Sequence, residues 1–80
     1  MKFNQIIAKR TRALMKERNW TQYKLSQQSG LPKSTLSHTL SGKGDNIEGN
    51  TILNICRGLD ISIFEFFNDP SFLPENIADD

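Results

Sequence analysis

The residues best suited to bind another molecule lie along one side of a short segment, from Lys33 to Ser41. This side carries ammonium, hydroxyl and imidazole groups, on Lys33, Ser34, Ser37, His38 and Ser41. Leu36 and Leu40, four positions apart, would share the opposite side of a helix. A helix with an apolar back and a short, cationic, polar front can sit in a DNA groove. A solvated surface helix has the same pattern, so this segment alone leaves both interpretations open.

The flanking residues predict a pair of helices joined by a tight turn. Thr21 can cap the first helix, because its hydroxyl can accept a hydrogen bond from a free backbone N–H in the first turn. Gly30 would end that helix in the left-handed conformation, and Gly42 would end the second helix in the same way. Pro32 has a φ suited to the start of the second helix, expected over about residues 33–41.

Another helix is predicted before this pair, with Asn4 as its N-cap and its end near Arg18. Its apolar side consists of Ile6, Ile7, Leu14 and Met15, and its cationic side chains are Lys9, Arg10, Arg12, Lys16 and Arg18. It lacks the bulky, continuous apolar face that binding to an anionic membrane would require. Asn19 suits a left-handed last position, and Trp20 is expected to pack in the link rather than stack on a base.

A fourth helix is predicted after a loop at residues 42–46, starting at Gly49 or Asn50. Its apolar residues follow the i, i+3, i+4, i+7 stripe of a core-facing helix: Ile52, Ile55, Cys56 and Leu59. This stripe explains Cys56 as a small buried hydrophobic residue rather than a reactive one.

A capping box from Ser62 to Glu65, with Ile61 and Phe66 as its hydrophobic staple, predicts a short fifth helix ending near Asn68. Residues 69–80 contain two prolines and four acids, and we expect an irregular or loosely ordered acidic tail. We therefore expect the chain to consist of one helical domain at residues 1–68 and an acidic C-terminal tail at residues 69–80.

Charge is strongly divided along the chain, although the net charge is only +1. Residues 1–44 hold nine of the ten Lys and Arg residues and one acid, whereas residues 45–80 hold one Arg and eight acids. Such a division suggests a polyanionic partner for the basic half. Chance segregation of surface charge is the alternative.

The chain offers few residues for catalysis or metal binding. His38 is the only histidine and Cys56 the only cysteine, too few for a zinc site or an internal disulfide. Gly42-Lys43-Gly44 lacks the spacing of a phosphate-binding P-loop. We expect no enzymatic activity, no cofactor and no metal. The longest apolar run is three residues, so we expect neither a signal sequence nor a membrane span, and a cytoplasmic location.

With these elements placed, the chain resembles the lambda-repressor-like (Cro/xenobiotic-response-element type) helix-turn-helix family over roughly residues 4–68. The matching motifs are Trp20-Thr21-Gln22, Gly30-Leu31-Pro32-Lys33-Ser34-Thr35-Leu36-Ser37, Ser41-Gly42-Lys43, Leu59-Asp60-Ile61-Ser62 and Glu65-Phe66-Phe67. The resemblance implies a compact, all-α, five-helix DNA-binding domain whose second and third helices form the helix-turn-helix.

The resemblance also implies roles for particular residues. Gln22, beside the cap Thr21, would touch a phosphate and brace the recognition helix, and Lys43 would contact the DNA backbone. Base edges in the major groove would face Lys33, Ser34, Ser37 and His38. Lys33 can donate to guanine O6 and N7, while the two serines are adaptable partners with little base preference. In the alternative, the serines are exposed residues with no role in binding.

Two departures from the family pattern stand out. Many relatives carry Arg where this chain has Met15, and Glu where it has Leu40, as a buried ion pair. Here both are apolar, so the joint replacement keeps the site compatible. Pro32 stands where Ser or Thr often caps the recognition helix, so that cap must come from elsewhere or be lost.

These patterns predict a sequence-specific regulator of transcription, a repressor, that binds a near-palindromic double-stranded operator as a homodimer. Two alternatives remain: an antitoxin-like autoregulator that binds a small protein partner, and a helix-turn-helix fold used only for protein interaction. We expect the dimer to form through the C-terminal half, with Phe72 in the interface. In the alternative, Phe72 and Leu73 fold back over the protein's own fifth helix.

Overall fold

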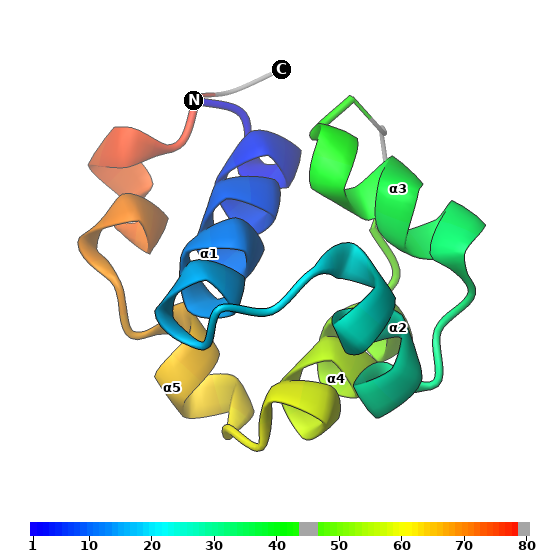
Figure 1. The fold of residues 1–80 in the computed structure, drawn as a ribbon. Coiled ribbons are helices and arrows are strands. Elements are labelled where there is room, and N and C mark those ends of the chain that lie inside the picture. The colour runs from blue at the N-terminus through cyan, green and yellow to red at the C-terminus, as the bar shows by residue number, and fades with distance from the viewer. Residues whose placement is uncertain (44–46, 79–80) are drawn as a thin grey trace.

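The computed structural model of the chain describes residues 1–43 and 47–78, and the regular elements in these ranges are all helical. They are α1 (Phe3–Glu17), α2 (Gln22–Ser29), α3 (Lys33–Ser41), α4 (Gly49–Leu59), α5 (Ile63–Phe67), and the 3-10 helices η1 (Pro70–Phe72) and η2 (Pro74–Asn76). Helix α1 lies between α2 and α3 on one side and the C-terminal turns on the other (Figure 1). None of the helices in these ranges is long and apolar enough to cross a membrane. The predicted all-α, five-helix fold is confirmed.

Most of the predicted helix ends are confirmed by the local geometry. The Thr21 hydroxyl accepts a hydrogen bond from the backbone N–H of Lys24 at 3.1 Å. Gly30 and Gly42 end α2 and α3 with φ values of 74° and 70°, which a residue without Cβ adopts at little cost. The Ser62 hydroxyl accepts from the N–H of Glu65 at 2.9 Å, as expected for the start of α5. The predicted loop at 42–46 lies partly outside the described residues.

The start of α1 differs from the prediction. Asn4 lies inside the helix, and the N-cap is Lys2. The side-chain carbonyl of Gln5 accepts from the backbone N–H of Lys2 at 3.0 Å, as the third helical residue does in a capping box. The prediction was wrong because a glutamine, reaching back one turn, replaces the expected side-chain cap of Asn4.

One apolar core contains residues from all five α-helices. Its buried members are Ile7, Leu14, Met15, Leu25, Leu36, Leu40, Ile52, Ile55, Cys56, Leu59 and Phe66. Met15 and Leu40 are only 8% and 5% exposed, so the two positions that carry an ion pair in many relatives are part of this core. Trp20 and Leu31 are half-buried against it. Burial also raises the pKa of the Cys56 thiol, as expected for a structural cysteine.

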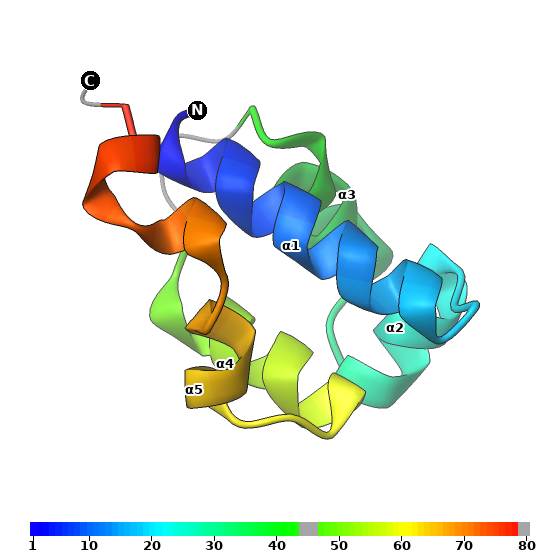
Figure 2. The same ribbon diagram turned by 90° about the vertical axis from the view of Figure 1, so that its left-hand side faces the viewer.

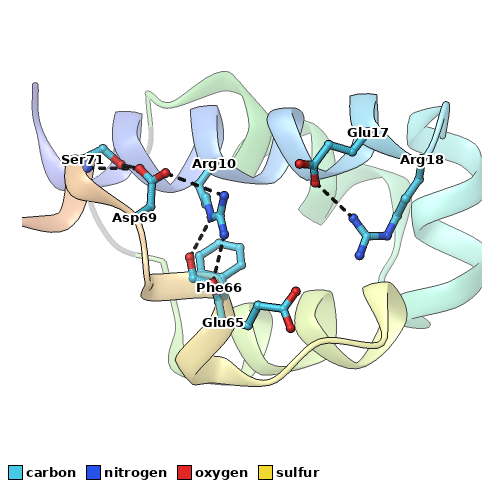
Figure 3. A network of polar contacts seen from close by, with 7 residues as sticks. All are labelled: Arg10, Glu17, Arg18, Glu65, Phe66, Asp69 and Ser71. Carbon is cyan, nitrogen blue, oxygen red and sulfur yellow. Dashed lines mark hydrogen bonds and ion pairs between the residues drawn. The ribbon is translucent and has the colours of Figure 1, made fainter.

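Arg10 of α1 and Arg18, which directly follows α1, bind the last turns of other helices, and Figure 3 shows the contacts of Arg10. Arg10 donates through Nε to the carbonyl of Phe66 at 2.8 Å and through Nη2 to that of Glu65 at 2.9 Å. Arg18 donates to the carbonyl of Leu59, at the end of α4, at 3.3 Å. The last carbonyls of a helix have no hydrogen-bond donor within the helix, so these guanidinium groups supply the missing donors. Arg10 and Arg18 therefore serve the fold, in addition to contributing positive charge.

The segment after α5 folds back along α1, where a loosely ordered tail was predicted (Figure 2). Phe72 packs against Phe67 and Phe3, with ring centroids 4.8 and 6.2 Å apart. The N–H of Ala78 donates to the carbonyl of Met1 at 2.8 Å, which brings the two ends of the described chain together. The proline-rich composition suggested disorder, but each proline instead begins a 3-10 turn. Asp79 and Asp80 lie outside the described residues.

Asp69 anchors the start of this segment. Its carboxylate accepts from the hydroxyl and the backbone N–H of Ser71 and lies 3.8 Å from Nη1 of Arg10. The hydrogen bonds from Ser71 and the positive charge of Arg10 lower the pKa of Asp69. The described part of the tail is thus held by hydrogen bonds, charge and aromatic packing.

Helices α2 and α4 approach each other closely at Gly58. A Cβ atom added at Gly58 would lie 2.8 Å from the backbone nitrogen and 2.9 Å from the Cα of Ser29. Backbone atoms cannot move aside as the end of a side chain can, so only glycine fits here. Sequence periodicity gives no sign of this contact.

We predict that Gly58→Ala destabilises the protein, although alanine is the better helix former. Overpacking of a well-filled contact costs ~1–3 kcal/mol, and each kcal/mol lowers Tm by ~4–8 °C in a domain of this size. Thermal unfolding followed by circular dichroism measures the effect. Gly49→Ala is the matched control, because a Cβ at Gly49 meets nothing within 4 Å and Gly49 begins the same helix. Equal melting of Gly58→Ala and the parent would contradict the close approach.

We also predict that Met15→Arg alone destabilises the protein, because it places an unpaired charge in the core, at a cost of ~3 kcal/mol. Adding Leu40→Glu should recover part of the loss, since the two positions lie in the same core cluster. Urea unfolding of the single and double variants measures both effects. A single variant that unfolds like its parent would show that Met15 is not packed as described.

Candidate nucleic-acid interface

Helix α3 presents the predicted polar side to solvent. Lys33, Ser34, Ser37 and His38 are all exposed, while Leu36 and Leu40 on the opposite side are buried in the core. Pro32 precedes the helix and provides no side-chain cap, so the cap found in many relatives is lost here. The apolar back fixes the helix to the domain and leaves its polar front accessible.

Gln22 connects α2 to this exposed side. Its side-chain Nε2 donates to the hydroxyl of Ser37 at 2.7 Å and lies 3.5 Å from the carbonyl oxygen of Lys33. Both contacts run from the first residue of α2 to α3. Ser37 accepts in this bond, so its own O–H remains able to donate to another molecule. Gln22 thus braces α3 from the side.

The turn between the helices is held by a second polar contact. The hydroxyl of Ser26 donates to the carbonyl of Leu31 at 2.7 Å, and Leu31 packs against the core beneath it. Together with the left-handed Gly30, this contact fixes the direction in which the chain leaves α2. The angle between α2 and α3 is therefore set on both sides of the turn.

The start of α2 offers backbone donors next to the exposed side of α3. Thr21 accepts from the N–H of Lys24, and the N–H groups earlier in this first turn have no partner within the helix. The N-terminal end of a helix also carries a partial positive charge, which favours anions. Thr21 and Gln22 are therefore placed where a phosphate oxygen could be bound.

Lys43 lies at the other end of α3. Its backbone N–H donates to the hydroxyl of Ser41 at 3.2 Å, and that hydroxyl donates to the carbonyl of His38 at 2.7 Å. The Lys43 side chain is exposed. The structure thus places Lys33 and Lys43 at opposite ends of the same helix, with Ser34, Ser37 and His38 between them.

Two features next to α3 were not singled out from the sequence. Tyr23 is 56% exposed, and the Lys33 ammonium lies over its ring, 4.9 Å from the centroid. An open groove of about 520 Å³ separates α3 from the start of α4, and His38 and Glu48 both line it. An aromatic residue between Gln22 and Lys24 was the only sequence signal for Tyr23.

Comparisons with known proteins bear on this arrangement. Neither the search of curated proteins nor that of solved structures found a match. The family model of the Cro/C1-type helix-turn-helix DNA-binding domain matches residues 11–70, which include the whole of α2, α3, α4 and α5. The chain therefore belongs to the Cro/C1-type helix-turn-helix family of DNA-binding domains.

Proposed function

We propose that this DNA-binding protein is a transcriptional repressor that binds a near-palindromic operator as a homodimer, with α3 in the major groove. The observation that carries the proposal is the exposed polar side of α3. The apolar side of the same helix is buried, and Gln22 braces the helix through Ser37. Such a helix can enter a groove without losing its packing. Occupancy of the operator would by itself block transcription.

Base reading is assigned to the exposed residues of α3. Lys33 can donate to O6 and N7 of guanine. Ser34 and Ser37 can each donate or accept, and neutral His38 offers one donor and one acceptor. Because Ser37 already accepts from Gln22, we assign it a donor role toward a base acceptor.

Phosphate binding is assigned to the two ends of the helix-turn-helix. The side-chain amide of Gln22 is directed to Ser37 and Lys33, so its backbone N–H and the hydroxyl of Thr21 are the donors left for a phosphate. Lys43 would meet the backbone beyond the other end of α3. The excess of cations in residues 1–44 supports a polyanionic partner for this half.

A homodimer would place two copies of α3 about 34–36 Å apart, one turn of the duplex. Phe72 is a poor candidate for the interface, because it packs on Phe3 and Phe67 within the domain. Among the described residues near the C-terminus, the large apolar side chains left exposed are Phe64 at 77%, Leu73 at 48% and Ile63 at 41%. Ile63 and Phe64 are neighbours on α5, and exposed aromatic and aliphatic side chains favour an interface, so we centre the interface on α5.

Lys33 and Lys43 should differ in how they affect binding. Lys43→Ala should weaken binding evenly across sequences and reduce the salt slope by ~1 per half-site, whereas Lys33→Ala should relax preference at one base pair. Sites selected from random duplex DNA provide the probe, with affinity measured between 50 and 200 mM salt. Over that range the parent should lose ~10³–10⁵ in affinity if 6–10 counterions are released. Retained binding with a flat salt response would contradict the proposal.

Phe64→Glu should convert the dimer to a monomer without loss of helix, because it places a charge in the proposed interface. The variant should bind a half-site weakly and lose cooperative binding to the full operator. Sedimentation, circular dichroism and titration of the two DNA probes measure these properties. Asn68→Asp, which adds the same charge at an exposed position after α5, is the control. An unchanged dimer would move the interface elsewhere, and a stoichiometric small protein partner would favour the antitoxin-like alternative.

A further inference from the structure

We propose that Tyr23 is a specificity-determining residue that acts by positioning Lys33. In this proposal the aromatic ring holds the lysine ammonium in one place beside the start of α3, so that Lys33 reads one base pair. The inference rests on the proposed function, because it assumes that α3 reads bases.

The contact joins the second residue of α2 to the first residue of α3. The Lys33 Nζ lies 4.9 Å from the centroid of the Tyr23 ring, well inside the distance of about 6 Å at which a cation is attracted to an aromatic face. Tyr23 is 56% exposed, so it does not owe its position to burial in the core. The side chain of Tyr23 instead contacts the amide of Gln27 and the ammonium of Lys33.

The ring itself is held from the same helix. Gln27, four residues further along α2, donates from Nε2 to the phenolic oxygen of Tyr23 at 3.1 Å. Residues four apart are neighbours on a helix surface, so this bond requires no distortion. A ring fixed in this way offers a stationary face to the ammonium.

Lys33 is therefore held at two points by consecutive residues of α2. Gln22 approaches its backbone carbonyl at 3.5 Å, and Tyr23 lies under its ammonium. A free lysine has a flexible four-carbon chain and can donate to phosphates or to several base edges. Restraint at both ends narrows the set of groups that its ammonium reaches, which sharpens base preference.

The size of the effect follows from the exposure of the pair. Cation–π contacts at exposed sites correspond to about a two- to five-fold change in an equilibrium constant. We therefore expect loss of the ring to reduce the base preference due to Lys33 by about two- to five-fold. Thermal stability should change little, because the contact lies at the surface.

The positioning contact can be tested in the free protein by nuclear magnetic resonance. Ring currents should shift the ε-methylene protons of Lys33 upfield in the parent and in Tyr23→Phe. The shift should vanish in Tyr23→Leu, which keeps an apolar side chain but no ring. An unshifted Lys33 in the parent would overturn the positioning role.

The reading role is tested by a double-mutant cycle on DNA. The probes are the duplex selected by the parent and a duplex changed only at the base pair whose preference Lys33→Ala relaxes. Tyr23→Leu should reduce the affinity ratio of these duplexes about two- to five-fold. Tyr23→Phe keeps the ring but loses the hydrogen bond from Gln27, so it should retain most of the ratio. Tyr23→Leu should have no further effect when Lys33→Ala is present. An equal loss in both backgrounds, or a Tyr23→Phe variant as defective as Tyr23→Leu, would overturn the inference.

The two experiments separate failure of the inference from failure of the proposed function. A parent that selects no DNA sequence overturns the proposed function and, with it, the reading role of Tyr23. A parent that selects DNA while Tyr23→Leu leaves every base preference unchanged overturns the inference alone. A fall in the melting temperature of Tyr23→Leu, with unchanged preference, would mean that Tyr23 serves only stability.

Discussion

The geometry of the candidate interface depends on the close contact between α2 and α4. Helix α2 has only eight residues and buries only Leu25 fully, so it would be marginal without its neighbours. Its place is set by α4, whose Gly58 lets the backbone of Ser29 approach. Because α2 supplies the brace of α3 and the aromatic partner of Lys33, a contact behind the interface determines how α3 is presented.

Positive charge serves two separate purposes in this domain. Arg10 and Arg18 direct their guanidinium groups to the last carbonyls of α5 and α4. Lys33 and Lys43 instead lie exposed at the two ends of α3. A count of basic residues therefore overstates the charge that is free to meet DNA, and the distinction depends on which side chains reach carbonyl groups within the domain.

Helix ends were predictable where the signal is local, as at Thr21, Gly30, Gly42 and Ser62. Each of these residues acts within one turn of its own position. The contacts of Arg10 join residues more than 50 positions apart, and the approach at Gly58 joins two helices, so periodicity could not reveal either. The packing of Phe72 could not be predicted for the same reason, because its partner rings come from α1 and α5. The exposed side of α3 was predictable from spacing, and its brace by Gln22 from the family resemblance. The contact of Lys33 with Tyr23 required the turn geometry.

The lone cysteine gives this domain a built-in reporter of its own opening. Cys56 is 1% exposed and lies on α4, two residues before the glycine that admits α2. Its thiol has a raised pKa, so little of the reactive thiolate forms at neutral pH. A thiol reagent can reach it only when the core around α4 separates. The rate of alkylation of Cys56 therefore measures how often the core around α4, which supports the helix-turn-helix, opens. No label needs to be added to the chain.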